Sequence, residues 1–213
     1  NSYIGTAIVK WTILTFDLSV TSNTATIWLN FAADLITALV AMIILRKFIK
    51  RQWKDFMKNK YSIIVAGCLV GYFFTICGNA LGNSIVKLFV DQSTSVNQQQ
   101  IESLTKNIPV LMFFVTGFLA PVGEELIFRG VVFTGLRKYN RVLAYIVSAF
   151  LFGFIHVMSS VFAGNIGEMI QMIPYMCSGL VFAYVYESTD NIWGSILTHM
   201  TNNIVAMVIL FLM

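Results

Sequence analysis

Two adjacent carboxylates and an arginine lie close together in the stretch PVGEELIFRG, residues 121–130, which is otherwise mostly apolar. On a helix, Glu125 and Arg129 are spaced i, i+4, which favours an ion pair, whereas Glu124 is turned away from that pair by about 100°. One carboxylate can therefore support the segment while the other takes part in chemistry. Pro121 lacks a backbone N–H, so it loosens the helix where solvent or substrate needs access.

Both histidines of the chain lie in two further apolar stretches. His156 ends FGFIH, in which Phe152 lies one turn earlier on the same helical face, and His199 begins HMTNN, in which Asn203 lies one turn later. A histidine within a helix is commonly a hydrogen-bonded core group. A charge at the centre of a membrane costs roughly 2.5 to 3.5 kcal/mol on insertion scales, however, so polar groups in apolar spans indicate function.

Together these groups suit the hydrolysis of a peptide bond. A carboxylate near a neutral imidazole, in a dry pocket, can take a proton from water and so make a nucleophile. The attacked carbonyl develops negative charge on its oxygen, which His199 and the side-chain amide of Asn203 could stabilise as hydrogen-bond donors. The loss of one such donor typically lowers the rate by about 10²- to 10³-fold.

Zinc chemistry is an alternative, because both glutamates and both histidines are possible ligands. The chain has no H-E-x-x-H motif, and Arg129 beside the carboxylates would oppose a cation. We therefore expect no metal and no other cofactor, and keep a zinc-dependent protease as the alternative.

Three other interpretations carry less weight. Ser195 lies one turn before His199, as in a serine hydrolase, but it lacks a G-x-S-x-G context and an orienting acid. A charge-coupled transporter would also bury Glu, Arg and His, although this chain is short and shows no repeat symmetry. The main rival is a non-catalytic membrane protein that confers immunity or scaffolds a partner and keeps the polar network for packing.

The composition places these groups in a membrane. Of the 213 residues, 57% are hydrophobic and 11% charged, and the mean hydropathy is +0.76, which is far from the balance of a soluble domain. A hydrocarbon core of about 30 Å needs roughly 20 apolar residues per helix. The length therefore predicts one integral membrane domain over residues 1–213, an all-α polytopic transmembrane bundle of six to seven spans, because helices satisfy their own backbone groups in lipid.

Apolar runs alternate with polar interruptions along the chain. They predict spans at about 25–45, 61–89, 108–136, 142–160, 166–187 and 192–213. Residues 1–20 fit either the end of a truncated span or an interfacial helix. The chain begins without a methionine and shows no signal peptide, so we expect an upstream piece to be missing. Asn30 and Asp34 form an i, i+4 pair that we interpret as structural or orienting.

The charge distribution predicts the orientation. The segment 46–60, RKFIKRQWKDFMKNK, contains seven Lys or Arg and a single Asp, and we interpret it as a cytoplasmic loop rather than a nucleic-acid site. Alternation then places the polar linker 91–107 outside and the basic segment 137–141 inside. Counted from the cytoplasmic ends, Glu124, His156 and Asn203 all lie at a depth of about 18 to 21 Å. The three cysteines lie in apolar runs without metal-ligand spacing and are expected to be small core residues.

The three polar sets occur in an order that is known from one family. EELIFRG, FGFIH and HMTNN resemble the successive E-E-x-x-x-R, F-x-x-x-H and H-x-x-x-N/D motifs of the CAAX protease and bacteriocin-processing family, also called Abi, which includes the type II CAAX prenyl endopeptidases. The resemblance covers residues 121–203 and implies a glutamate-dependent intramembrane endopeptidase. It implies that Glu124 and His156 activate the water. It also implies that Glu125 and Arg129 support the site, and that His199 and Asn203 form the oxyanion hole.

The resemblance also bears on the substrate. Eukaryotic members of the family cleave a tripeptide after a prenylated cysteine, whereas this compact chain is more similar to bacterial members, which are linked to bacteriocin self-immunity, leader removal and quorum-sensing peptides. We therefore expect a membrane-associated peptide, such as a bacterial pheromone or bacteriocin precursor, to be cleaved in the bacterial cytoplasmic membrane. The lipid bilayer is the other expected partner, no nucleic acid is expected, and the oligomeric state is left open.

Overall fold

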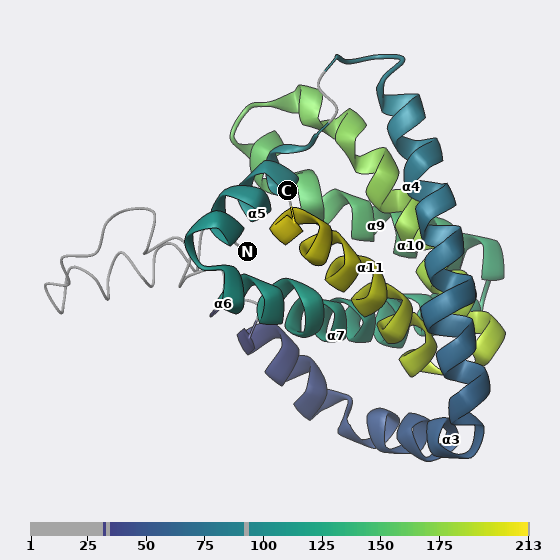
Figure 1. Ribbon diagram of the computed structural model, residues 1–213. Helices are drawn as coiled ribbons and strands as arrows, with labels where there is room; N and C mark the ends of the chain where they lie inside the picture. Colours follow the sequence, from purple (N-terminus) through teal and green to yellow (C-terminus); the bar gives the residue numbers. More distant parts are fainter. Residues whose placement is uncertain (1–31, 33–34, 92–93, 213) are drawn as a thin grey trace, which may run out of the picture.

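The computed structural model describes residue 32 and residues 35–91 and 94–212 (Figure 1). Among these residues there are helices and turns but no strand. Five helices are long and apolar enough to cross a membrane, and Leu35–Ile44 forms a shorter apolar helix. The predicted all-α, multi-pass membrane fold is therefore confirmed. The Asn30–Asp34 pair and residues 1–20 lie outside the described residues.

The first long helix contains the basic segment 46–60, so the loop predicted there was wrong. It runs from Arg46 to Val86 through α3 (Arg46–Val65), the π-helical turn η1 (Ala66–Gly71) and α4 (Tyr72–Val86). Lys, Arg and Gln are good helix formers, so a high charge does not by itself make a loop. Asn59 has non-helical backbone angles, φ −119° and ψ 22°. Figure 1 shows α3 along the bottom of the molecule, from which the chain turns upward into α4.

The second span, Pro109–Arg137, contains both glutamates of the first motif. It is preceded by α5 (Val96–Asn107), so most of the predicted polar linker is helical. The span consists of α6 (Pro109–Phe114), η2 (Val115–Leu119), α7 (Ala120–Glu125), η3 (Leu126–Phe133) and α8 (Thr134–Arg137). The segments η2 and η3 are π-helical, and such turns often occur at functional sites. The glutamates therefore lie in a short α-helix between two irregular turns.

The last three spans follow the predicted bounds to within a few residues. They comprise α9 (Arg141–Phe162), the 3₁₀-helix η4 (Ile166–Gln171) followed by α10 (Met172–Thr189), and α11 (Ile192–Leu212). The Asn140 side chain accepts a hydrogen bond of 2.9 Å from Leu143 N and so caps the start of α9. Asp190, with φ 44°, ends α10 in the left-handed conformation.

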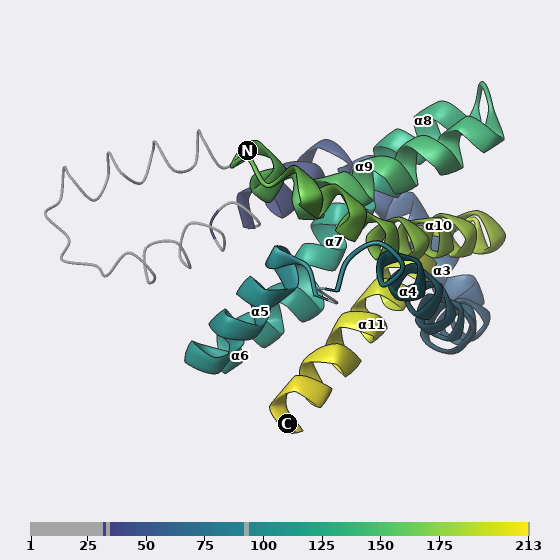
Figure 2. The same cartoon turned by 90° about the horizontal axis from the view of Figure 1, so that it is seen from above.

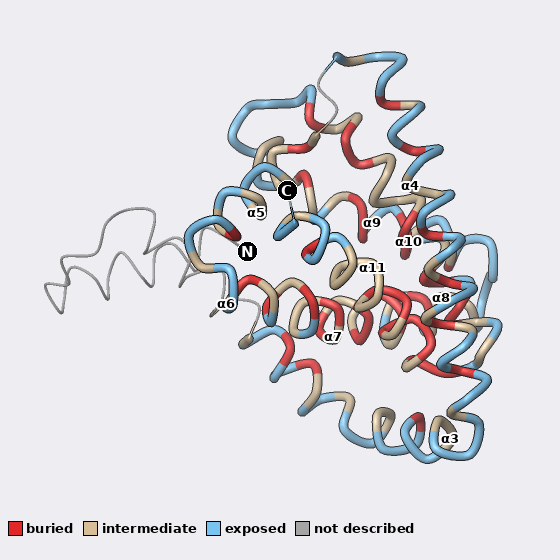
Figure 3. The backbone as a smooth tube through the Cα atoms, in the orientation of Figure 1, coloured by how far each residue is buried: buried red, intermediate tan, exposed pale blue. Residues whose placement is uncertain are grey.

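Helix α10 packs against α9, α4 and α11 and so holds the bundle together, an arrangement that can be followed from above in Figure 2. Close approach between α4 and α10 depends on Gly82, where an added Cβ would lie 2.6 Å from Pro174 Cα. Buried segments gather along α7 and the helices around it, whereas much of α3 and α4 is exposed (Figure 3). The exposed side of α4 includes Phe73, which suits contact with lipid.

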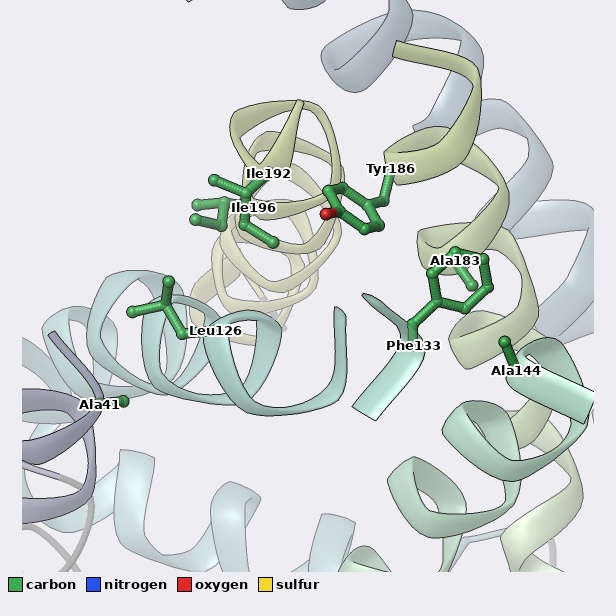
Figure 4. Packing of buried hydrophobic residues seen from close by; sticks show 8 residues of the cluster. All are labelled: Ala41, Leu126, Phe133, Ala144, Ala183, Tyr186, Ile192 and Ile196. Atoms are coloured by element: carbon green, nitrogen blue, oxygen red, sulfur yellow. The ribbon is translucent and has the colours of Figure 1, made fainter. Parts of the chain in front are cut away.

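One apolar cluster lies directly beside the glutamate segment, because Leu126 belongs to it. Its buried members are Ala41, Leu126, Phe133, Ala144, Ala183, Tyr186, Ile192 and Ile196 (Figure 4). The cluster joins the second span to α9, α10 and α11. The cysteines form no disulfide, but only Cys68 and Cys177 are partly buried. Cys77 is exposed, so its predicted core placement was wrong; an apolar pattern cannot distinguish a face against protein from a face against lipid.

The start of α11 is held by α3. The Gln52 side-chain carbonyl accepts a hydrogen bond of 2.6 Å from Ile192 N, and the Gln52 backbone carbonyl accepts one of 2.9 Å from the Asn191 side chain. Gln52 is buried. The basic helix therefore has a structural role at the end of the helix that carries His199 and Asn203.

Candidate active site

Glu124 on α7 and His156 on α9 face each other. The distance between Glu124 Oε2 and His156 Nε2 is 3.9 Å, and the two side chains are 23% and 15% exposed. His156 Nδ1 lies 2.7 Å from the Phe152 carbonyl oxygen. Because a carbonyl only accepts hydrogen bonds, Nδ1 carries the hydrogen, and the neutral ring presents a lone pair at Nε2. Both atoms then accept hydrogen bonds, and their separation of 3.9 Å is short enough for one water to donate to both.

The second glutamate is the centre of a buried polar network. Glu125 and Arg129 are both 0% exposed, and Arg129 Nη1 donates to Glu125 Oε1 over 2.9 Å, so the i, i+4 ion pair predicted from the sequence is present. Arg129 Nη2 donates to the Gly179 carbonyl over 2.6 Å. The same Glu125 oxygen lies 3.1 Å from His199 Nδ1. The structure therefore links the first and third motifs through one carboxylate.

Aromatic rings enclose this network. The Arg129 guanidinium lies 4.7 Å from the ring centre of Phe152 and 5.3 Å from that of Phe182, which stabilises a cation in apolar surroundings. Phe182 also stacks on the His199 ring, with ring centres 4.6 Å apart and an angle of 22° between the planes. The ring of Phe152, which covers Arg129, explains the aromatic residue at this place in the second motif, whereas its backbone carbonyl, which any residue would offer, orients His156.

Asn203 is oriented by the segment before the glutamates. Its Nδ2 donates to the Thr116 carbonyl in η2 over 2.9 Å, and its Oδ1 accepts from Asn202 Nδ2 over 3.2 Å. Asn203 is partly buried. His199 thus contacts Glu125, and Asn203 donates to Thr116. Both partners belong to the second span, which therefore orients the two polar side chains of the third motif.

The serine-hydrolase alternative is not favoured by the position of Ser195. This side chain is fully buried, and its hydroxyl donates to the Ile192 carbonyl over 3.1 Å within the first turn of α11. Among the residues that the structure describes, no group of three or more His, Cys, Asp or Glu side chains is arranged to hold a metal ion.

Three residues of α10 complete the surroundings of the site, and the sequence analysis missed them. Tyr175 stacks on His156, with ring centres 4.3 Å apart and planes 18° apart, Gly179 accepts from Arg129, and Phe182 stacks on His199. These positions follow the spacing i, i+4, i+7, which marks one face of a helix. The signal was therefore present, but a search for charged and polar groups in apolar spans passes over an aromatic ring and a glycine.

The fold and these contacts define a multi-pass helical membrane protein in which the second span, α9, α10 and α11 build a polar, partly enclosed site. Residues 106–205 match the family model described as type II CAAX prenyl endopeptidase, Rce1-like. Over residues 106–205 the chain is therefore similar to a family of membrane peptidases, as its three motifs indicate. The enzyme class predicted from the sequence, a peptidase, is thereby confirmed at the level of the family.

Three of the similar bacterial proteins illustrate the likeness, and two of them carry peptidase or protease names. The chain is 27% identical to a putative membrane peptidase, YdiL, of Bacillus subtilis, over 82% of this chain and 67% of that protein. It is 29% identical to an uncharacterized protein of Mycoplasma capricolum, over 78% of this chain and 48% of that protein. It is 26% identical to the membrane-embedded CAAX protease MroQ of Staphylococcus aureus, over 69% of this chain and 58% of that protein. The chain thus spans about half to two thirds of the length of these relatives. No solved structure matches it.

Proposed function

We propose that the protein hydrolyses a peptide bond in a membrane-associated peptide and that the reaction depends on Glu124. The observation that carries this proposal is the 3.9 Å approach of Glu124 Oε2 to His156 Nε2 from two different spans. A water that donates one hydrogen to each of these acceptors turns its oxygen lone pairs away from them. The oxygen is then directed at whatever carbonyl carbon lies opposite.

The proposed reaction needs no group beyond these residues and water. Glu124 takes a proton from the water as the water oxygen forms a bond to the carbonyl carbon of the peptide, and the carbonyl oxygen becomes an oxyanion. Glu124 then passes the proton to the peptide nitrogen. The carbon–nitrogen bond breaks, the carbonyl re-forms, and the products are a carboxylic acid and an amine.

His199 and Asn203 are the proposed oxyanion donors. The Asn203 amide has two N–H groups, of which one donates to the Thr116 carbonyl, so the second can serve the substrate. His199 Nδ1 faces the Glu125 carboxylate, which orients the ring. With Nδ1–H bonded to Glu125, the neutral ring has a lone pair at Nε2 and cannot donate to the oxyanion. The proposed role therefore requires the imidazolium form, in which Nε2–H is the donor.

A peptide held in the membrane is the proposed substrate because the site is built from membrane spans. Such a peptide can approach between helices from the side, without leaving the bilayer. Two relatives carry the names membrane peptidase and membrane-embedded CAAX protease, and both are bacterial. We propose that the protein lies in the bacterial cytoplasmic membrane, with the basic segment 46–60 on the cytoplasmic side. We propose a bacterial pheromone or bacteriocin precursor as the peptide.

The proposal is tested with purified protein, candidate precursor peptides and mass spectrometry of the products. Glu124→Gln keeps the size of the side chain and removes the base, so we expect product formation to fall by about 10²- to 10⁴-fold while the protein still inserts and folds. Glu102→Gln, the same change on α5 at a carboxylate that contacts Gln98, is the matched control and should cleave at the wild-type rate. Full turnover by the folded Glu124→Gln variant would refute the assignment.

A further inference from the structure

Tyr175 makes the closest ring contact of His156. The two ring centres are 4.3 Å apart and the planes differ by 18°, whereas Phe152 approaches the same imidazole at 4.9 Å with a tilt of 48°. Tyr175 belongs to none of the three motifs. It lies on α10, between the spans that carry His156 and His199.

The hydrogen bond of His156 fixes only part of the orientation of the imidazole, and the stacked Tyr175 ring restricts the rest. The bond from Nδ1 to the Phe152 carbonyl holds one atom of the imidazole, but the ring can still tilt about that atom. Any such tilt moves Nε2, the atom that lies 3.9 Å from Glu124 Oε2. A flat neighbour against one face opposes the tilt, because stacked aromatic rings lose contact when one of them turns.

Tyr175 is itself held by the segment at the start of α5. Its hydroxyl lies 2.7 Å from Ser95 Oγ and accepts from Asn97 Nδ2 over 3.3 Å. Ser95 is only 4% exposed and also caps α5 by accepting from Gln98 N. The buried Glu168 carboxylate accepts from Val96 N over 3.1 Å. The start of α5 is thus fastened to η4 and α10 at the point from which Tyr175 reaches His156.

We propose that Tyr175 is a positioning residue, whose ring keeps His156 Nε2 opposite Glu124 and whose hydroxyl is held by Ser95 and Asn97. This inference rests on the proposed function only for its kinetic consequence. Stacked pairs contribute about 2- to 12-fold when their interaction free energy is converted to a ratio. Loss of the ring should therefore lower kcat by about 2- to 12-fold and leave KM within about twofold, because the substrate still binds.

The test compares Tyr175→Leu and Tyr175→Phe with Tyr184→Leu as the matched control. Tyr184 lies on the same helix, is half exposed and contacts Phe74 rather than a histidine. Tyr175→Phe keeps the ring and should retain kcat, as should Tyr184→Leu. Tyr175→Leu removes the ring and should lower kcat by about 2- to 12-fold. If Tyr175→Leu does not fold, Tyr175→Met fills the space without a ring and takes its place.

A second readout does not depend on proteolysis. The chain has two histidines, so the imidazole NMR signals can be assigned with the single variant His199→Gln. Loss of the ring current alone shifts the His156 ring protons, so the readout is the number and width of their signals. We expect one sharp set in the wild type, Tyr175→Phe and Tyr184→Leu, and broadened or doubled signals in Tyr175→Leu or Tyr175→Met, because the freed imidazole samples more than one tilt. One equally sharp set in the ring-less variants would overturn the inference. If the wild-type protein cleaves nothing, the proposed function fails, but the NMR result still decides the role of Tyr175.

Discussion

Removing one partner of the buried Glu125–Arg129 ion pair should destabilise the protein strongly. Both side chains are 0% exposed, and Arg129 also donates to the Gly179 carbonyl. Arg129→Met keeps a long side chain but removes the cation that faces the Glu125 carboxylate, which keeps only its contact with His199, and the donor to this carbonyl. Removing one partner of a buried pair typically costs about 3 to 5 kcal/mol. For a chain of 213 residues, each kcal/mol corresponds to about 2 to 4 °C, so we expect the melting temperature to fall by about 6 to 20 °C.

The measurement is a thermal unfolding curve in detergent, followed by the fluorescence of the four tryptophans. Arg137→Met is the matched control, because Arg137 is in the same span but its partner Asp190 is 80% exposed, and such pairs contribute at most about 1 kcal/mol. The double variant Glu125→Gln, Arg129→Met should be less destabilised than the sum of the single changes, since no charge is left unpaired. Equal melting temperatures for Arg129→Met and Arg137→Met would refute the reasoning.

Four further results are expected. Gly82→Ala should lower the free energy of unfolding by about 1 to 3 kcal/mol, because its Cβ would lie 2.6 Å from Pro174 Cα. Its control is Gly135→Ala, whose Cβ would have no atom within 4 Å and which should not destabilise the protein in the same melting assay. Gln52→Ala should lower the free energy of unfolding by about 1 to 3 kcal/mol, because it removes the acceptor for the first N–H of α11. An unchanged melting curve would show that the contact between α3 and the start of α11 does not stabilise the protein. Asn203→Ala should lower kcat by about 10²- to 10³-fold in the peptide assay, and a wild-type kcat would remove it from the oxyanion hole. Cleavage should persist in the presence of a zinc chelator, and a loss of activity that zinc restores would favour the zinc-dependent alternative.

The sequence alone was sufficient for the fold class and for one local contact of the candidate site. Apolar runs of about 20 residues have one stable outcome in a membrane, a helix, so the bounds of α9, α10 and α11 followed closely from hydropathy. The Glu125–Arg129 pair also followed from the sequence, because i, i+4 neighbours on a helix face each other whatever surrounds them. The three polar motifs indicated the family for the same reason: their spacing is local.

Contacts between helices were decided only by the tertiary structure. Glu125 and His199 are 74 positions apart, and no periodicity states which faces of two separate helices meet. The contribution of α10 was missed because the sequence does not show whether an aromatic ring or a glycine lies in a core, at a lipid surface or beside an imidazole. The basic segment of α3 was misread because charge reports exposure to water, not backbone conformation, and Gln52 shows that this helix also has a buried contact. The sequence thus determined which polar side chains share a face of one helix, and the packing of four spans determined which side chains of different helices meet.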